Sequence, residues 1–292
     1  MDLSLLSKPD RSSIILSASR TKQATHSAIR QARFRSAVLW FLSLPLLTFL
    51  LTPIVALVAR VSLADLLSNL VDRQVAQAVG LSMVTTLTTM LVAVVAGTPV
   101  AYLLARRRFR GRTGLDTLID LPMILPPSVA GIALLMAFGR RGLIGHYLDD
   151  VGIEIAFTQI AVVLAQTFVA TPYYVKSAAA GFASVDHELE QAAALDGATS
   201  LQAFRHVTLP LAWRALVGGA AMTLARALGE FGATIIFAGN LPGRTQTMPL
   251  AIYIGFELNL NTALALALIL LVASFAILLV VKSILHQSVR NL

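Results

Sequence analysis

Six long apolar segments constrain what this chain can fold into more than any other feature. Each is close to the roughly 20 residues that a helix needs to cross a bilayer core about 30 Å thick. The composition agrees, because 57% of the residues are hydrophobic and only 13% are charged. The segments are residues 38–59, 79–104, 118–138, 155–174, 211–237 and 262–281. We therefore expect an all-α membrane protein with six transmembrane helices.

Prolines predict that the third segment is not a straight helix. Pro122, Pro126 and Pro127 all lie within it. Proline removes a backbone hydrogen bond and clashes with the preceding turn, so it kinks or breaks a helix. In a membrane such a break is tolerated where neighbouring helices or a water-filled cavity satisfy the freed carbonyls. We expect a kinked or broken span here and milder bends at the prolines of the first two segments.

The basic residues predict the orientation of the chain. A formal charge of +8 could suit a nucleic-acid-binding protein, but these residues form short blocks beside the apolar segments. Seventeen Lys and Arg residues fall on the side that holds both termini, and five fall in the opposite loops. Cytoplasmic loops carry such an excess. We expect both termini and the loops at 105–117 and 175–210 to be cytoplasmic, and we expect no nucleic-acid partner.

Residues 1–35 form a basic segment ahead of the first apolar stretch. They contain seven basic and two acidic residues, and no apolar core of signal-peptide length. We interpret them as a cytoplasmic tail that can contact anionic membrane lipid, and residues 36–292 as one membrane domain. An organelle transit peptide, which is also basic and rich in serine, is the alternative.

The longest polar stretch in the second half of the chain, at about 184–210, predicts two short helices. Ser184 can cap the first helix, because a hydroxyl accepts hydrogen bonds from free N–H groups at a helix start. Gly197 is expected to end it, since glycine adopts the left-handed conformation easily. Thr199 and Gln202 have the spacing of a capping box and predict the start of the second helix.

The second helix is expected to carry an apolar ridge. Leu201, Phe204 and Val207 recur every three residues, which puts them on one face. Pro210 disfavours the helical conformation at Leu209, so the helix should end there. The expected product is a compact helical projection at the membrane surface.

A spaced pattern of small and apolar residues runs through this projection. It consists of Gln191, Ala192, Ala193, Gly197, Val207, Leu209 and Pro210. The pattern resembles the EAA loop of ABC-importer permeases, the cytoplasmic coupling helix that docks on the ATPase. The usual first glutamate of that family is Gln191 here, with Glu190 one position earlier, which leaves the role of the acidic group open. The alternative is an ordinary amphipathic loop between membrane helices.

The resemblance implies an ABC type I importer permease fold, with a coupling loop that meets the ATPase. In that case the ridge of the second helix would fit a groove of the ATPase. The residues implied in coupling are Glu190, Gln191, Ala192, Ala193, Gly197, Leu201, Phe204, Val207, Leu209 and Pro210.

Arg226 and Glu230 are ionisable residues deep in the fifth apolar segment. A charged side chain at the bilayer centre costs about 2.5–3.5 kcal/mol on insertion scales, so neither is expected to face lipid. Their i, i+4 spacing allows them to pair along one helix face. Two interpretations stay open: a buried pair that fixes helix packing in a dimer, or an Arg226 that lines the path of an anion.

The loop at 239–247, which follows on the external side, concentrates glycine, proline, a cation and hydroxyls. Such a loop can offer backbone N–H groups and a positive charge to an oxyanion. The longer runs 225–234 and 238–253 resemble the corresponding region of molybdate-importer permeases and, less closely, of sulfate/thiosulfate permeases. The resemblance implies a tetrahedral oxyanion as the substrate, namely molybdate or tungstate, with sulfate or thiosulfate as the alternative. The candidate residues of its path are Arg226, Glu230, Thr234, Arg244, Thr245 and Thr247.

Two further patterns leave alternatives open. The second segment carries the hydroxyl residues Ser82, Thr85, Thr86, Thr88 and Thr89. Such hydroxyls usually bond back to carbonyls of their own helix, but they can also bind an anion or a partner helix. The small residues at 218–221 would allow close helix contact at a dimer axis, or only a local kink.

The chain has no phosphate-binding Gly-x-x-x-x-Gly-Lys-Ser/Thr loop, no cysteine and no catalytic constellation. We expect a permease subunit that is not an enzyme and binds no cofactor or metal, with ATP and Mg²⁺ on a separate ATPase. The resemblance implies two ATPase copies, an extracytoplasmic binding protein, a second copy of this chain, and a place in the inner (plasma) membrane. An ion-coupled secondary anion transporter, with Arg226 and Glu230 as its charge relay, is the alternative from another class.

Overall fold

The computed structural model describes residues 39–62, 66, 68–69 and 72–290. The chain divides into two units, Met1–Arg60 and Val61–Leu292, which we describe separately. In the first, the helix Leu39–Arg60 is 22 residues long, with a mean hydropathy of 2.3. The predicted tail at 1–35 lies outside the described residues. In the described part of the second unit all regular structure is helical.

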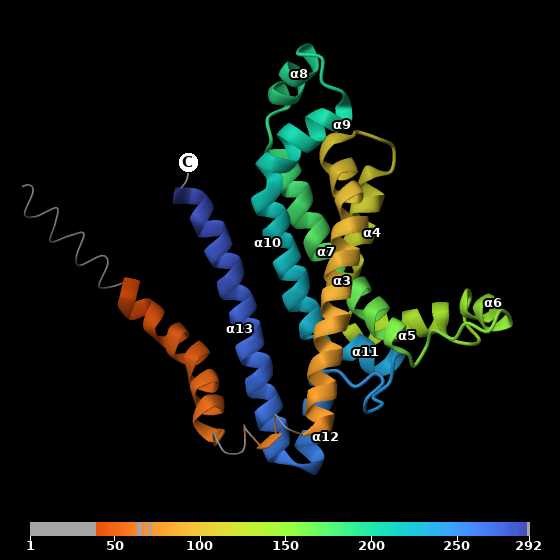
Figure 1. Cartoon of the computed structure of the whole chain (residues 1–292), viewed down its shortest axis with the longest axis vertical. Coiled ribbons are helices and arrows are strands. Elements are labelled where there is room, and N and C mark those ends of the chain that lie inside the picture. Colours follow the sequence, from red (N-terminus) through yellow and green to blue (C-terminus); the bar gives the residue numbers. More distant parts are fainter. Residues whose placement is uncertain (1–38, 63–65, 67, 70–71, 291–292) are drawn as a thin grey trace, which may run out of the picture. The chain divides into compact units, whose positions relative to one another are not determined.

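Three long helices pack side by side in the core of the second unit (Figure 1): α3 (Arg73–Arg106), α7 (Gln159–Ser184) and α10 (Leu209–Leu228). Small residues allow the close contact between α7 and α10. A Cβ added at Gly219 would lie 2.8 Å from the Cβ of Ser177, whereas one at Gly218 would meet nothing within 4 Å. Gly219 therefore serves packing inside the subunit, and Gly218 leaves an open surface on α10.

The third apolar segment is broken, as its prolines predict. It forms α4 (Arg112–Ile124) and α5 (Pro127–Phe138), which are bent by 115°. Leu125 and Pro126 between them have ψ angles near 135°, outside the helical region. Since a residue before proline is pushed toward extended backbone, the two adjacent prolines explain the break.

The fifth apolar segment is also broken, and our expectation of one continuous helix was wrong. The helix α10 ends at Leu228, and α11 (Gly232–Phe237) begins three residues beyond its cap at Gly229. A carboxylate oxygen of Glu230 accepts the Ala233 N–H at 2.8 Å and so starts the new helix. A hydropathy profile averages over the whole apolar segment, so it does not reveal a single capping side chain within it.

The two broken spans meet through their short second halves. A Cβ added at Gly131 of α5 would lie 2.9 Å from the Ala233 carbonyl oxygen of α11, and one at Gly232 would lie 2.7 Å from the Cβ of Pro127. Ala130, Ala233 and neighbouring apolar residues bury this contact. The crossing of α5 and α11 therefore depends on glycine at both positions.

The remaining helices lie at the ends of the bundle or beside it (Figure 1). They are α6 (Gly145–Asp150), α8 (His187–Leu195), α9 (Ser200–Ala203), the π-helical turn η1 (Phe204–Thr208), α12 (Met248–Leu258) and α13 (Leu260–Arg290). Within the second unit, α8 and α9 lie at one end of the α3–α7–α10 bundle and α12 lies at the opposite end.

The described residues contain four helices long and apolar enough to cross a membrane, or five if the bent pair α4 and α5 counts as one span. The fourth predicted segment corresponds to α7, which has 26 residues and carries polar side chains such as Gln166 and Lys176. Its central place in the bundle explains why it is less apolar than a helix that faces lipid. The all-helical membrane fold is confirmed, and the count of six spans stays a prediction.

Candidate functional site

The polar stretch between α7 and α10 forms a helical projection that we call the knob (residues 186–208). Its first helix, α8, is capped by Asp186, whose carboxylate accepts the Glu188 N–H at 3.0 Å. Ser184 is not the cap, because α7 continues through it and its hydroxyl donates to the Gly181 carbonyl at 2.8 Å. The expected helix is present, and it starts two residues later than the serine suggested.

The turn inside the knob follows the sequence closely. Gly197 has a φ angle of 88°, the left-handed conformation expected of the residue that ends α8. Thr199 and Gln202 form the predicted capping box, in which the Thr199 N–H donates to the Gln202 side chain at 2.8 Å. These short-range predictions are confirmed, because each depends only on neighbouring residues.

The second helix of the knob does not end before Pro210. Helical structure runs without interruption through α9, η1 and α10, a stretch of 29 residues from Ser200 to Leu228. The π-helical turn immediately before Pro210 closes with a bond from the Leu209 N–H to the Phe204 carbonyl. A proline is tolerated in a first helical turn, where its missing N–H is not needed. The knob is therefore directly continuous with a core helix of the bundle.

The expected ridge of three apolar side chains is not formed. Leu201 is 74% exposed, but Phe204 turns inward, with its ring centroid 5.1 Å from that of Tyr102 and 6.0 Å from that of Phe182. Val207 is half-buried. The i→i+5 bonding of η1 changes the angular spacing of residues, so a period of three no longer keeps them on one face. Leu201 alone of the three presents its side chain mainly to the outside.

Glu190 fixes the knob to the bundle through a set of contacts that we call the Glu190 joint (Arg106, Glu190 and Thr208). Arg106 Nη2 at the end of α3 lies 3.1 Å from Glu190 Oε1, and the Thr208 hydroxyl donates to the same oxygen. Arg106 also donates to the Val185 carbonyl at 2.9 Å. The side chains of Arg106 and Glu190 are 11% and 13% exposed.

The acidic group beside the family pattern takes part in the joint. Glu190 makes the ionic contact, whereas Gln191, at the position of the usual family glutamate, is exposed. The neighbouring Ala192 is exposed and Ala193 half-buried. Sequence reasoning missed Arg106, which it counted only as one charge of a basic loop. Two features of the sequence could have indicated this pair. The carboxylate of Glu190 lies one position before the family's usual glutamate, and Arg106 lies at the end of a predicted membrane helix.

Arg226 and Glu230 pair at the opposite end of α10. Arg226 Nη1 lies 2.7 Å from Glu230 Oε2, and the side chains are 26% and 1% exposed. The two do not share one continuous helix face as expected, because Glu230 lies in the break before α11. Its other oxygen caps α11 through Ala233. The pair thus has a structural role, and Arg226 keeps an open face.

The hydroxyl residues of α3 divide between the two expected roles. Thr85 and Thr88 bond back to carbonyls of their own helix at 2.9 and 2.8 Å. Ser82 instead accepts the Met248 N–H at the start of α12 at 2.7 Å. Thr89 donates to Gln166, whose amide donates on to the Ala227 carbonyl at 3.1 Å. Thr86 is buried and its hydroxyl has no partner among the described residues.

In the loop at 239–247, four of the backbone donors are bonded within the loop itself. The Leu241 carbonyl accepts the N–H groups of Arg244, Thr245 and Gln246 at 3.0, 2.9 and 3.0 Å. The Thr245 hydroxyl accepts the Leu241 N–H at 3.1 Å, so Thr245 closes the loop on itself. These four N–H groups are therefore not free for an oxyanion, and a role of this loop in oxyanion binding stays a prediction. Arg244 is exposed.

Thr234 and Thr247 remain as polar groups without a visible function in packing. Both are buried, with relative exposures of 0% and 1%. Their hydroxyl oxygens have no hydrogen-bond partner in the described part of the chain. Buried hydroxyls are normally bonded, so these two are available to a ligand or to water.

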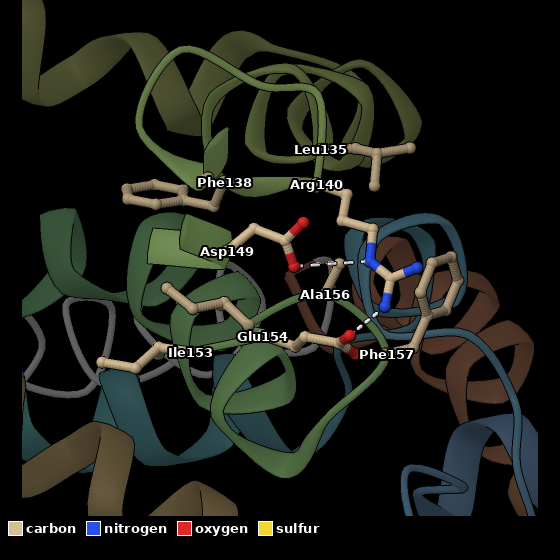
Figure 2. A pocket seen from close by; sticks show the side chains of 10 residues that line it. Leu135, Phe138, Arg140, Asp149, Ile153, Glu154, Ala156 and Phe157 are labelled. Carbon is tan, nitrogen blue, oxygen red and sulfur yellow. Dashed lines mark hydrogen bonds and ion pairs between the residues drawn. The ribbon is translucent and has the colours of Figure 1, made fainter. Parts of the chain in front are cut away.

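A cavity of about 280 Å³ lies between α5, α6 and the chain before α7. Figure 2 shows Arg140 in it between Asp149 and Glu154. The hydrogen bond and charge of Glu154, and then the charge of Asp149, raise the pKa of Arg140 above its ordinary value. Because two carboxylates already surround this guanidinium, the cavity is a poor site for an anion.

A second set of charges that the sequence reasoning missed joins α4 to α7. Lys176 Nζ lies 2.7 Å from Asp116 Oδ1 and 2.8 Å from Asp120 Oδ2. The i, i+4 spacing of the two aspartates on one helix was the signal that could have revealed it. This contact holds the first half of the broken span against the core.

Comparisons with known proteins agree with this geometry. The family described as binding-protein-dependent transport system inner membrane component matches residues 94–291, which include the knob. The matching family and its relatives, together with the helical fold, define the class, a helical membrane permease of an ABC importer. The chain belongs to the binding-protein-dependent transport system inner membrane component family. The predicted membership among ABC-importer permeases is confirmed.

Several relatives are similar over most of their length. The molybdenum transport system permease protein ModB of Mycobacterium tuberculosis is 43% identical over 233 residues, which cover 80% of this chain and 88% of that protein. The putative molybdenum transport system permease protein YvgM of Bacillus subtilis is 41% identical over 194 residues, 66% of this chain and 86% of that protein. The sulfate transport system permease protein CysT of Salmonella typhimurium is 38% identical over 189 residues, which cover 64% of this chain and 68% of that protein.

Solved structures support the fold at low sequence identity. A bacterial ABC transporter involved in the import of the acidic polysaccharide alginate has a TM-score of 0.67 at 15% identity, covering 91% of this chain and 98% of that chain. The inward-facing MetNI methionine ABC transporter has a TM-score of 0.55 at 16% identity, covering 74% and 94%. Both likenesses concern the arrangement of helices alone.

Proposed function

We propose that this chain is the membrane-spanning subunit of an ATP-driven importer of molybdate. The observation that carries the proposal is the knob, a helical projection that is continuous with α10 and fixed to α3 by the Glu190 joint. The substrate follows from the relatives named as molybdenum permeases, at 43% and 41% identity. Sulfate is the second candidate, because a sulfate permease is 38% identical over a shorter region.

The knob transmits the work of ATP hydrolysis in this scheme. Two ATPase subunits bind ATP and Mg²⁺, and two copies of this chain each present one knob to them. The exposed Leu201 enters the ATPase surface, while Phe204 and the Glu190 joint bind the knob to the bundle. Because α9, η1 and α10 are continuous, a displacement of the knob moves α10 with it.

The oxyanion passes beside Arg226. This residue lies in the last turn of α10, where the negative end of the helix dipole favours a cation. Glu230 neutralises part of its charge, which keeps anion binding weak enough for release. Thr234, Thr247 and Arg244 are the other candidates for the path. The open surface at Gly218 is where a second copy of the chain can approach α10 closely.

The chain sits in the inner (plasma) membrane, with the knob and both termini on the cytoplasmic side. Support for this orientation comes from the excess of Lys and Arg on that side. An extracytoplasmic binding protein delivers the anion to the opposite face, near α12. Alternating access then requires that the break between α10 and α11 respond to movement of the knob.

Transport by proteoliposomes tests this function. The permease, its ATPase and the binding protein are reconstituted, and molybdate uptake is measured with ATP inside the vesicles. We expect uptake that needs ATP and the binding protein and survives a proton ionophore. Uptake that collapses with the ionophore and ignores ATP would identify an ion-coupled secondary transporter instead. Titration of the binding protein with molybdate, tungstate and sulfate then decides the substrate.

A further inference from the structure

The loop that joins α3 to α4 carries four exposed arginines. They are Arg107, Arg108, Arg110 and Arg112. The ion pairs of the described residues involve other groups, so these four guanidinium groups have no carboxylate partner there. Arg106 differs from them, because its side chain is only 11% exposed and takes part in the Glu190 joint. We call residues 107–112 the arginine loop.

The apolar outer faces of α3 and α4 lead directly to the arginine loop. Leu103 on α3 and Leu118 on α4 are large apolar side chains exposed on the surface of the unit. At about 1.5 Å per residue, they lie roughly 6 and 9 Å from the nearest arginine of the arginine loop along their helices. The headgroup layer on each side of a bilayer is about 5–8 Å thick. If acyl chains cover these leucines, the arginines reach the level of the lipid phosphates.

The loop is chemically uniform and open. Residues 105–114 contain no acidic side chain, and the nearby Asp116 is engaged by Lys176 at 2.7 Å. Phe109, exposed between the arginines, suits the boundary between apolar and polar layers. A Cβ added at Gly111 or Gly114 would meet nothing within 4 Å, so a bulky headgroup can approach the backbone there.

We propose that the arginine loop binds the phosphate groups of anionic phospholipids. Charge complementarity supplies the attraction, and the apolar outer faces of α3 and α4 supply the place of the acyl chains. A soluble acidic protein surface would match the charge but would leave those faces unexplained. Arg106, the residue immediately before the arginine loop, forms the ion pair of the Glu190 joint. A lipid bound at the loop therefore anchors the end of α3 to which the knob is attached.

Lipid selectivity of the assembled transporter tests the proposal. The full chain with its ATPase is placed in nanodiscs of phosphatidylcholine and phosphatidylglycerol, and the association of spin-labelled forms of both lipids is measured. The test variant is Arg108→Gln/Arg110→Gln. The matched control is Arg73→Gln/Arg141→Gln, which removes two exposed arginines elsewhere in the described part of the chain. Arg108→Lys/Arg110→Lys retains the charge.

We expect the wild type and the control to prefer phosphatidylglycerol and the test variant to lose that preference. The loss should be about fivefold for each arginine removed, from about 1 kcal/mol per basic residue near an anionic surface. The lysine variant should retain most of it, and high salt should weaken it. Retained selectivity in the test variant would overturn the proposal.

Two other outcomes also count against it. If the test variant loses its ATPase during purification while its lipid selectivity is unchanged, the arginines contact a protein. If millimolar glycerol phosphate in solution displaces the labelled lipid fully, the loop is a site for free phosphate esters. Selectivity that persists in glycerol phosphate and disappears only with the arginines supports the lipid source.

Discussion

Arg106–Glu190 and Arg226–Glu230 are the same kind of ion pair, formed beside the two ends of α10. The first joins residues far apart in the sequence and connects α3, α8 and η1. The second joins residues four apart and shapes one chain segment, the break before α11. Identical chemistry therefore does two things here: one pair positions an element on the bundle, and the other interrupts a helix inside it.

The two pairs also differ in how exposed to water each charged side chain would be if its partner were removed. In the Glu190 joint both side chains are nearly buried, at 11% and 13% exposure, so loss of either leaves a charge with little access to water. In the second pair only the glutamate is fully buried, whereas Arg226 is 26% exposed. Mutation of the Glu190 joint should thus destabilise the position of the knob. Mutation of Arg226 should instead reduce transport with little effect on the structure.

Breaking the Glu190 joint should have the largest effect. Glu190→Ala leaves Arg106 without a carboxylate, and breaking a buried pair from one side costs about 3–5 kcal/mol. We expect loss of ATP-driven uptake and faster proteolysis of the knob. The exchange Arg106→Glu/Glu190→Arg should recover part of both. Glu188→Ala, an exposed change on the same helix, is the control. Normal uptake by Glu190→Ala would mean that the knob needs no such anchor.

Arg226→Gln should reduce uptake by about tenfold or more while the subunits still assemble. The bond from Glu230 to the Ala233 N–H does not involve the arginine, so α11 keeps its cap. Uptake at matched expression measures the effect, with Arg226→Lys expected to lie between. Unchanged transport would remove Arg226 from the anion path.

Substitutions at Leu201 and Phe204 should separate two properties of the knob. Leu201 is expected to contact the ATPase, and Phe204 is expected to hold the knob against the helical bundle. Leu201→Asp changes an exposed side chain, so ATPase co-purification should fall about tenfold with little loss of thermal stability. Phe204→Ala removes ring contacts with Tyr102 and Phe182, so stability should fall by about 2–3 kcal/mol. A pull-down and a thermal melt of each variant measure both properties. If Leu201→Asp binds the ATPase normally, its surface is not the contact.

The smallest expected difference in stability is between alanine substitutions at Gly218 and Gly219, two adjacent residues of α10. Gly219→Ala would place a methyl group 2.8 Å from Ser177 and should cost about 1–3 kcal/mol. Gly218→Ala has open space inside the subunit and should leave subunit stability unchanged. Thermal unfolding compares the two. Any effect of Gly218→Ala should appear only as weaker association between two copies of the chain, measured by cross-linking.

The parts of the fold that depend on neighbouring residues could be predicted from the sequence. The glycine stop at Gly197, the capping box at Thr199 and the break at Pro126 are of this kind. Each is decided within one turn of the chain. The start of α8 was predicted almost correctly, since serine and aspartate cap helices equally well and only the path of α7 selects Asp186.

The parts that depend on distant partners could not be predicted. Nothing local shows that Arg106 reaches Glu190, or that Glu230 turns back to start α11 inside an apolar run. The π-helical turn at η1 reverses the expected exposure of Phe204, because its ring finds partners on α3 and α7. In the loop at 239–247, the Thr245 hydroxyl accepts the Leu241 N–H, a contact that composition alone does not reveal.

The position of the knob relative to the membrane is the most direct test of this account. The chain contains no cysteine, so Leu201→Cys introduces a single exposed thiol. A membrane-impermeant maleimide is applied to intact cells, to opened cells and to the assembled complex. We predict labelling only after the cells are opened, and protection when the ATPase is bound. Labelling of intact cells from outside would contradict the proposed mechanism.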